Sequence, residues 1–176
     1  RGPRALLVVV AAIVLALGLQ GAVVTAAATT GGQQRHSISD DEISIQLWTF
    51  AEYIGFGTDA ATITRTPEVF QRLSAMGYLN LEPFTLSGLS AEDYRALLDE
   101  YGLKASARHV DVGRPENPAN IDQIIADNKT LGIKFFGSGS TPIFPLVYST
   151  EAQWVAYSQY LNDVGEQARQ AGQTLM

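Results

Sequence analysis

"SAEDYRALLDEYGLKASARHV", residues 90–110, decides the fold class. Ser90 followed by Asp93 is typical of a helix N-terminus, where the serine oxygen accepts a hydrogen bond from a backbone N–H. Apolar residues then recur at helical spacing up to Gly102, and glycine commonly closes a helix. The next run, "KASARHVDV" (104–112), is predicted to be a strand. A helix that leads directly into a strand is one unit of an alternating α/β chain.

The same unit recurs on both sides of this stretch. Strands are expected at 43–50, 78–84, 104–112, 133–139 and 173–176. Helices are expected to begin at Thr66-Pro67-Glu68, Ser90, Asn117-Pro118 and Thr150, and to end at Gly77, Gly102, Gly132 and Gly172. This alternation predicts a parallel sheet built from four βα units and the start of a fifth strand.

Polar residues within the strands favour a barrel over an open sheet. Strands that helices cover on both faces are usually continuous apolar runs. Here Asn80 and Glu82 alternate with leucines, and Ser44 and Gln46 alternate with isoleucines. A barrel interior with a polar mouth accommodates such a face, and no G-x-G-x-x-G follows the first strand. We therefore predict an α/β fold, a (β/α)8 TIM barrel truncated here to about four βα units plus the start of a fifth strand. An open doubly wound sheet is the alternative.

The N-terminal segment has the pattern of a signal peptide. Two arginines precede an apolar run, and Ala26 and Ala28 fit the A-x-A pattern of a cleavage site. We predict a signal peptide at 1–28 and export to the periplasm or the outside of the cell after cleavage near Ala28; a retained membrane anchor is the alternative. A polar linker at 29–42 then precedes the folded domain at 43–176.

Charge and composition disfavour several classes of function. Removal of Arg1 and Arg4 with the signal peptide leaves 10 basic against 18 acidic residues, a formal charge of −8. A protein that binds nucleic acid usually carries a basic stripe, so no nucleic-acid partner is expected. The sequence has no cysteine and therefore no disulfide. It also lacks an H-E-x-x-H motif, a Walker A loop and a G-x-S-x-G elbow.

Two polar residues stand out at the expected strand ends, where (β/α)8 enzymes hold their substrates. Glu82, just before Pro83, can accept hydrogen bonds from sugar hydroxyls or pair with an arginine, Arg108 or Arg114. His109 can donate to a substrate oxygen, or it can be a half-buried histidine bonded to the backbone.

The other candidates near the strand ends are weaker. Trp48 and Phe50 can form an apolar wall for a sugar ring or pack in the core. Strand alternation places Asp111 with His109 on the face of Ala105 and Ala107, although Asp111 also suits a loop. Ser138 lies in "GSGS" (137–140), whose backbone amides can face an anion.

Four stretches carry a resemblance to a known family: "ISIQLWTF", "VFQRLSAMGYLNLEPF", "SAEDYRALLDEYGLKASARHV" and "IADNKTLGIKFF". Together, residues 43–176 resemble the N-terminal half of the xylose isomerase-like TIM barrels. That family includes sugar phosphate isomerases and epimerases, with apurinic endonucleases as distant relatives. The resemblance implies that Glu82 and His109 line the substrate pocket.

The same resemblance implies a divalent metal (Mn, Mg, Co or Zn) bound by Glu, Asp and His at the ends of the fifth to eighth strands. No metal ligand is therefore expected in this chain, which we expect to be a fragment at both ends. The implied activity is metal-dependent proton transfer beside a carbonyl of a carbohydrate or sugar phosphate. The alternatives are a non-catalytic exported sugar-binding barrel and an endonuclease-type phosphodiesterase. Contact with the membrane is expected only through the signal segment.

Overall fold

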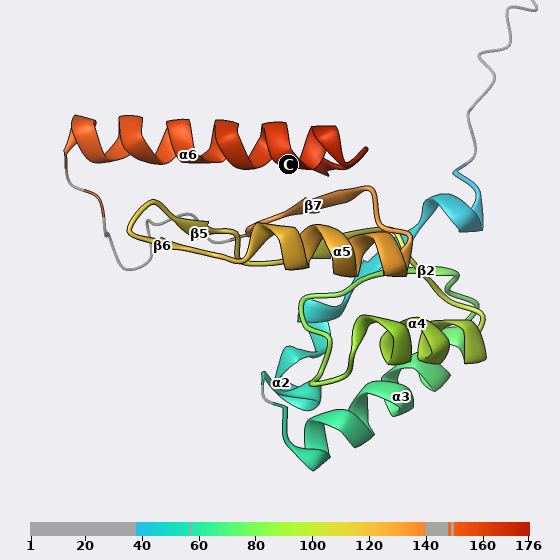
Figure 1. The fold of residues 1–176 in the computed structure, drawn as a ribbon. Coiled ribbons are helices and arrows are strands. Elements are labelled where there is room, and N and C mark those ends of the chain that lie inside the picture. The colour runs from blue at the N-terminus through green and yellow to red at the C-terminus, as the bar shows by residue number, and fades with distance from the viewer. Residues whose placement is uncertain (1–37, 57, 140–147, 149) are drawn as a thin grey trace, which may run out of the picture. The chain divides into compact units, whose positions relative to one another are not determined.

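The computed structural model describes residues 38–56, 58–139, 148 and 150–176 (Figure 1). The predicted signal peptide at 1–28 lies outside the described residues, as does most of the linker. The end of that linker forms a 3-10 turn, η1 (Asp40–Glu42). Within the described ranges, we find no helix that combines the length and apolar character needed to cross a bilayer.

The first three strands are parallel and lie in the order of the chain. β1 (Ser44–Gln46) pairs with β2 (Asn80–Glu82), and β2 pairs with β3 (Lys104–Ala105). The register places Ile45 beside Leu81 and Leu81 beside Ala105, so their side chains share one face of the sheet.

The order continues through the second group of strands. β4 (Ala107–His109) pairs with β7 (Phe135–Gly137), and β7 pairs with β8 (Thr174–Leu175), all in parallel. In a doubly wound sheet the order reverses at a switch point, whereas each strand of a (β/α)8 barrel lies beside the next in the chain. The observed order is the barrel order.

Ser106 interrupts the expected third strand and separates β3 from β4. Its N–H donates to the carbonyl of Leu81 at 2.9 Å, and its hydroxyl lies 2.7 Å from that of Ser44. Ala105 packs into the core beside the helices, and Arg108 also contacts a helix, at Asp127. In a regular strand, residues 105 and 108 would point to opposite faces. The prediction that His109 shares a face with Ala105 is therefore wrong, because the interruption reverses the alternation.

The first predicted strand, 43–50, was too long. The chain leaves β1 after Gln46 and forms a 3-10 turn, η2 (Leu47–Phe50), followed by the short helix α2 (Ala51–Ile54). Leu47 and Ile54 are both almost fully buried. Leu47 and Ile54 thus serve core packing rather than strand pairing.

The helix expected to start at Thr66-Pro67-Glu68 starts earlier. α3 spans Ala60–Ala75, and the Asp59 side chain caps it by accepting from the Thr62 N–H at 2.9 Å. Pro67 lies inside the helix, where its missing N–H removes one backbone hydrogen bond. Thr66 is buried and its hydroxyl donates to the carbonyl of Thr62 at 3.0 Å. The threonine–proline pair therefore does not mark the N-terminus.

The later helices follow the sequence more closely, with one exception. α4 (Ala91–Glu100) and α6 (Glu151–Gln170) start after Ser90 and Thr150, as predicted. The third helix was expected to begin near Asn117-Pro118, but these residues form β6, antiparallel to β5 (Gly113–Arg114). α5 (Ile121–Leu131) begins after Asn120, whose side chain accepts from the Gln123 N–H at 3.1 Å. Gly113 has φ +77°, and a Cβ there would lie 2.4 Å from the Ala119 nitrogen.

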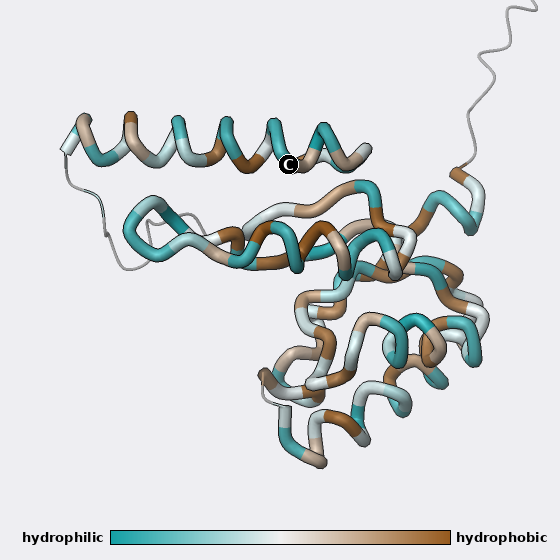
Figure 2. Tube along the Cα trace, viewed as in Figure 1, coloured by the Kyte–Doolittle hydropathy of each residue, from teal (hydrophilic) through white to brown (hydrophobic). Residues whose placement is uncertain are grey.

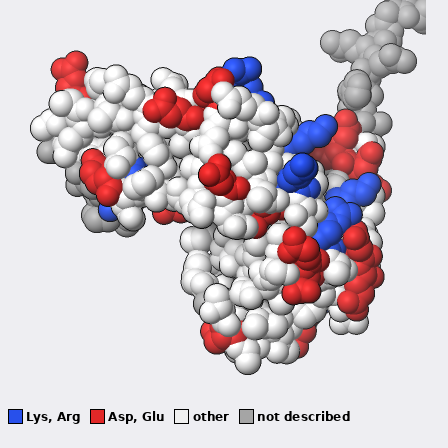
Figure 3. Space-filling model, viewed as in Figure 1, with Lys and Arg blue, Asp and Glu red and all other residues white. Residues whose placement is uncertain are grey.

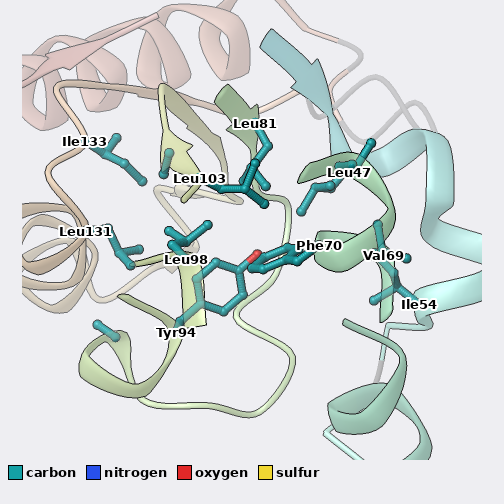
Figure 4. Packing of buried hydrophobic residues seen from close by; sticks show 13 residues of the cluster. Leu47, Ile54, Val69, Phe70, Leu81, Tyr94, Leu98, Leu103, Leu131 and Ile133 are labelled. Atoms are coloured by element: carbon teal, nitrogen blue, oxygen red, sulfur yellow. The ribbon is translucent and has the colours of Figure 1, made fainter. Parts of the chain in front are cut away.

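Two hydrophobic clusters pack the helices onto one face of the strands. The first joins β1–β3 to α3 and α4, and Figure 4 labels ten of its members: Leu47, Ile54, Val69, Phe70, Leu81, Tyr94, Leu98, Leu103, Leu131 and Ile133. The second joins β7 to α5 and α6, with Val112, Ile121, Ile124, Phe136, Val164 and Ala168. Hydrophobic and hydrophilic residues alternate along the helices, as expected when one side of each is buried (Figure 2).

The opposite face of the strands carries the polar residues that favoured a barrel. We call it the open face, defined by Ser44, Gln46, Asn80, Glu82 and His109. These side chains are exposed or half-buried, whereas their neighbours Leu81 and Arg108 are buried. Strand ends on this face are therefore where a ligand can reach polar groups.

Candidate functional site

Glu82 and Gln46 lie side by side at the C-terminal ends of their strands. They are register partners in the β1–β2 pair, and the Gln46 Nε2 donates to the Glu82 Oε1 at 3.1 Å. No other hydrogen bond reaches the Glu82 carboxylate from the described part of the chain. The alternative partner Arg108 instead contacts Asp127 on α5. One carboxylate oxygen thus stays available to a ligand.

His109 is held at the end of β4 by its backbone and by its ring. Its N–H donates to the carbonyl of Pro83 at 2.8 Å, which ties it to the residue after Glu82. Its Nε2 accepts from the Gly139 N–H at 2.9 Å. The imidazole also stacks on the Trp48 ring, with centroids 5.9 Å apart and planes 17° from parallel. The histidine therefore has the expected backbone contact and still lines the open face.

Trp48 joins two aromatic residues that sequence reasoning missed. Phe84 and Phe56 approach it edge-on, with ring centroids at 5.3 Å and 5.1 Å. Trp48 is 50% exposed and Phe56 is 64% exposed. The only available signal for Phe84 was its place directly after Glu82-Pro83. We refer to Trp48, Phe56 and Phe84 as the aromatic platform.

The structure does not bring Phe50 into this group. Phe50 packs against the first hydrophobic cluster and lines a hollow of about 200 Å³ with Tyr53, Val69 and Leu73 of the helical layer. The 3-10 turn after β1 separates it from Trp48, because successive residues of a turn do not alternate as in a strand. The expected wall of Trp48 and Phe50 is replaced by the aromatic platform.

Asp111 and Ser138 take other places near the strand ends. Asp111 is exposed, and its side chain accepts from the Gly113 N–H at 2.8 Å, so it shapes the turn into the β5–β6 hairpin. Ser138 lines a separate hollow of about 530 Å³ beside α6. The Gly139 amide, expected to face an anion, is directed to His109 instead.

A second polar contact lies near the hairpin. The Tyr148 hydroxyl donates to the Glu116 carboxylate at 2.7 Å, and this bond lowers the pKa of Glu116. Burial, followed by the same bond, raises the pKa of Tyr148 to about 12. Trp154 and Tyr157 of α6 pack against the Tyr148 ring. This group links Tyr148 to the hairpin segment and to α6, and it shares no residue with the aromatic platform.

The described residues do not form a metal site. They contain no group of three or more His, Asp or Glu side chains placed to hold an ion. Divalent cations such as Mg²⁺ and Mn²⁺ take several oxygen ligands. Glu82 and His109 each already have a partner, Gln46 and Gly139. The expectation that residues beyond the described ones bind a divalent ion remains a prediction.

Comparison with known proteins finds likeness in structure only. No protein-family model and no curated protein matches the sequence. A xylose isomerase-like TIM barrel protein from Mycobacterium smegmatis, in complex with magnesium, gives a TM-score of 0.55 at 15% identity, covering 79% of this chain and 56% of that one. A family 2 AP endonuclease from Brucella melitensis gives 0.54 at 12% identity, covering 75% and 52%.

Sugar epimerases share the likeness. An L-ribulose 3-epimerase gives a TM-score of 0.51 at 19% identity, covering 76% of this chain and 48% of that one. The chain thus spans about half the length of these solved structures. The likeness shows that it shares the α/β fold of the xylose isomerase-like TIM barrels, as the sequence motifs suggested.

Proposed function

We propose that residues 43–176 form the N-terminal half of a (β/α)8 barrel and supply part of the carbohydrate site of a metal-dependent sugar isomerase or epimerase. One observation carries this proposal. Glu82 with Gln46, and His109 with Trp48, meet at the C-terminal ends of neighbouring strands. Strand ends of this kind hold the substrate in TIM-barrel enzymes.

The chemistry of these groups suits a sugar. The free Glu82 oxygen accepts hydroxyl protons, and charged acceptors give the stronger hydrogen bonds. The exposed part of the aromatic platform offers an apolar surface to the C–H face of a sugar ring. Sites for small molecules combine an apolar wall with a few placed polar groups, and this arrangement does so.

In this proposal the described residues bind and orient the sugar. A divalent ion would supply a Lewis acid for a substrate oxygen. Its ligands would come from outside the described part of the chain, because the residues present do not fit one. Glu82 and His109 hold hydroxyls in place beside the reacting carbon, and neither is assigned the proton transfer.

The endonuclease reading is disfavoured by charge. The whole chain has a formal net charge of −6, and on the face shown in Figure 3 basic side chains are flanked by acidic ones. A phosphodiester backbone binds to clustered lysine and arginine. A non-catalytic sugar-binding barrel would use the same strand-end groups, so the test must separate binding from turnover.

Tryptophan fluorescence provides that test. The chain has two tryptophans, so the Trp154→Phe variant leaves Trp48 as the only reporter. We expect ketoses or their phosphates to change its emission saturably, and the full-length protein with added Mn²⁺ or Mg²⁺ to convert the bound sugar. Binding without turnover would support the non-catalytic barrel, and no response of the full-length protein to any sugar would contradict both readings.

A further inference from the structure

The hydrogen bond between Gly139 and His109 defines the protonation of the histidine ring. The Gly139 backbone N–H can only donate, and it lies 2.9 Å from the Nε2 of His109. Nε2 must therefore present a lone pair. The ring is then neutral, with its proton on Nδ1, because a neutral imidazole carries one N–H and one acceptor nitrogen.

Glycine is needed for this contact. A Cβ at position 139 would lie 2.1 Å from the His109 Cε1 and 2.6 Å from its Nε2, closer than any carbon can approach. The backbone reaches the ring only because residue 139 has no side chain. Trp48 meanwhile covers one face of the same ring. His109 is thus restrained at its edge and on its face by two separate segments of the chain.

The other ring nitrogen remains available. Among the residues that the structure describes, none forms a hydrogen bond with Nδ1, and the side chain is half-buried. In the tautomer defined by Gly139, this nitrogen carries the proton. His109 therefore offers one N–H donor beside Trp48 and Glu82, and its Nε2 is not free to bind a metal.

We propose that Gly139 is a positioning residue that holds His109 as the Nδ1–H tautomer, so that His109 donates to an oxygen of the bound sugar. The identity of the ligand rests on the proposed function. The tautomer does not, because it follows from the Gly139 contact alone. The partner of a histidine's other nitrogen commonly sets which nitrogen is protonated.

Nitrogen-15 NMR measures the tautomer directly. The chain has two histidines, so the His36→Gln variant leaves His109 as the only one. In the labelled full chain at about pH 8, where an ordinary imidazole is neutral, we expect a protonated Nδ1 and an unprotonated Nε2. Sedimented protein studied by magic-angle spinning gives the same reading if the chain self-associates. The opposite tautomer would overturn the proposal.

Variants connect the tautomer to binding. Gly139→Ala should abolish the Nδ1–H preference and weaken sugar binding about tenfold, the loss of one hydrogen bond of about 1.4 kcal/mol. Gly165→Ala is the matched control, because nothing lies within 4 Å of a Cβ there. His109→Asn keeps an N–H near the Nδ1 position and should retain more affinity than His109→Gln, whose amide reaches the Nε2 position.

The two proposals fail in different ways. The expected tautomer in a chain that binds no sugar would contradict the proposed function and leave the role of Gly139 in setting the tautomer intact. Sugar binding by a chain with the opposite tautomer would leave the function intact and remove the role of Gly139. Equal affinity in the Asn and Gln variants would also count against donation from Nδ1.

Discussion

Arg108 on β4 lies 3.4 Å from the carboxylate of Asp127 on α5, with side chains only 9% and 17% exposed. Burial lowers the pKa of Arg108, and the Asp127 charge acts in the opposite direction. The Arg108 Nε and the nearby Tyr94 hydroxyl are buried without a hydrogen-bond partner in the described structure. The contact is therefore a largely buried ion pair, and the polar groups around it are only partly hydrogen-bonded.

Removing one member of this pair should be costly. Asp127→Ala leaves a guanidinium buried without its countercharge, and we expect the free energy of unfolding to fall by about 3 kcal/mol. Urea unfolding of the protein measures the loss. Asp99→Ala is the control, since the Arg95–Asp99 pair is exposed and should contribute less than about 0.5 kcal/mol.

Replacing both members should be far less harmful. In the double variant Arg108→Met, Asp127→Leu no buried charge remains, and apolar replacements of buried ion pairs are often neutral or stabilising. We expect unfolding within about 1 kcal/mol of wild type, or above it. A double variant as unstable as Asp127→Ala would show that the pair itself stabilises the β4–α5 contact.

Glu82 should contribute to sugar affinity through its charge. Glu82→Gln keeps the size of the side chain and replaces a charged acceptor, so binding should weaken about tenfold or more. The Trp48 fluorescence titration in the Trp154→Phe background measures this effect. Glu100→Gln, at the exposed end of α4, controls for the change of net charge. Equal affinities for the two variants would remove Glu82 from the site.

Tyr148 should make stability sensitive to alkaline pH. Its pKa is raised from 10.0 to about 12 in the folded chain, so folding favours the neutral phenol. This contribution is complete below pH 10.0 and is lost as the pH rises toward about 12. Comparing the unfolding free energies of wild type and Tyr148→Phe across this window should show a difference that shrinks with pH. A constant difference would contradict the shift.

The sequence predicts a structural element well when the residues that determine it lie within a few positions of one another. Ser90, Asn120 and Thr150 cap the helices through side chains that bond within their own turn. Two of these helix starts were predicted correctly for that reason. The start of α3 was predicted wrongly, because Thr66-Pro67 has the residue types of a helix N-terminus although it lies inside the helix.

The candidate site depends on contacts between distant segments. Glu82 and His109 could be singled out as candidates because each is a polar residue at a strand end, and their role in binding a sugar remains a prediction. The position of Phe50 outside the site could not be predicted. It follows from the turn after β1, and the residues of that turn are of types common in strands. The Gly139 contact joins His109 of β4 to the segment that follows β7, and no spacing along the chain encodes it.

Export can be checked directly. We propose that cleavage follows Ala28, and expression in a bacterial host should give a mature protein that begins at Thr29. Peptide mass mapping of the N-terminus checks this. Ala28→Asp should block cleavage, because the site requires small residues. Membrane-bound protein that retains residues 1–28 in the wild type would support the anchor alternative.

Residues 43–176 expressed alone should not behave as a stable monomer. β1 and β8 each pair with one neighbour among the described strands, and unpaired edges promote association. Phe135 alternates with the buried Phe136 along β7 and is 47% exposed, and Trp48 is 50% exposed. Leaving each such side chain unburied forgoes about 1.5–3 kcal/mol, against a typical domain stability of about 5–15 kcal/mol. We expect dimers, aggregates or a molten state by light scattering and thermal unfolding.

A variant on an edge strand distinguishes association by strand pairing from nonspecific hydrophobic association. Thr174→Lys places a charge on β8, and charges on an edge strand discourage pairing with another chain. If edges cause the association, this variant should contain a larger monomer fraction than Gln170→Lys, which places the same charge at the exposed end of α6. A monodisperse wild-type monomer with a cooperative two-state melt would mean that the described strands form a stable open sheet and not half of a barrel. Glu82 and His109 would then lie on an ordinary sheet surface, and the proposed sugar site would lose its barrel mouth.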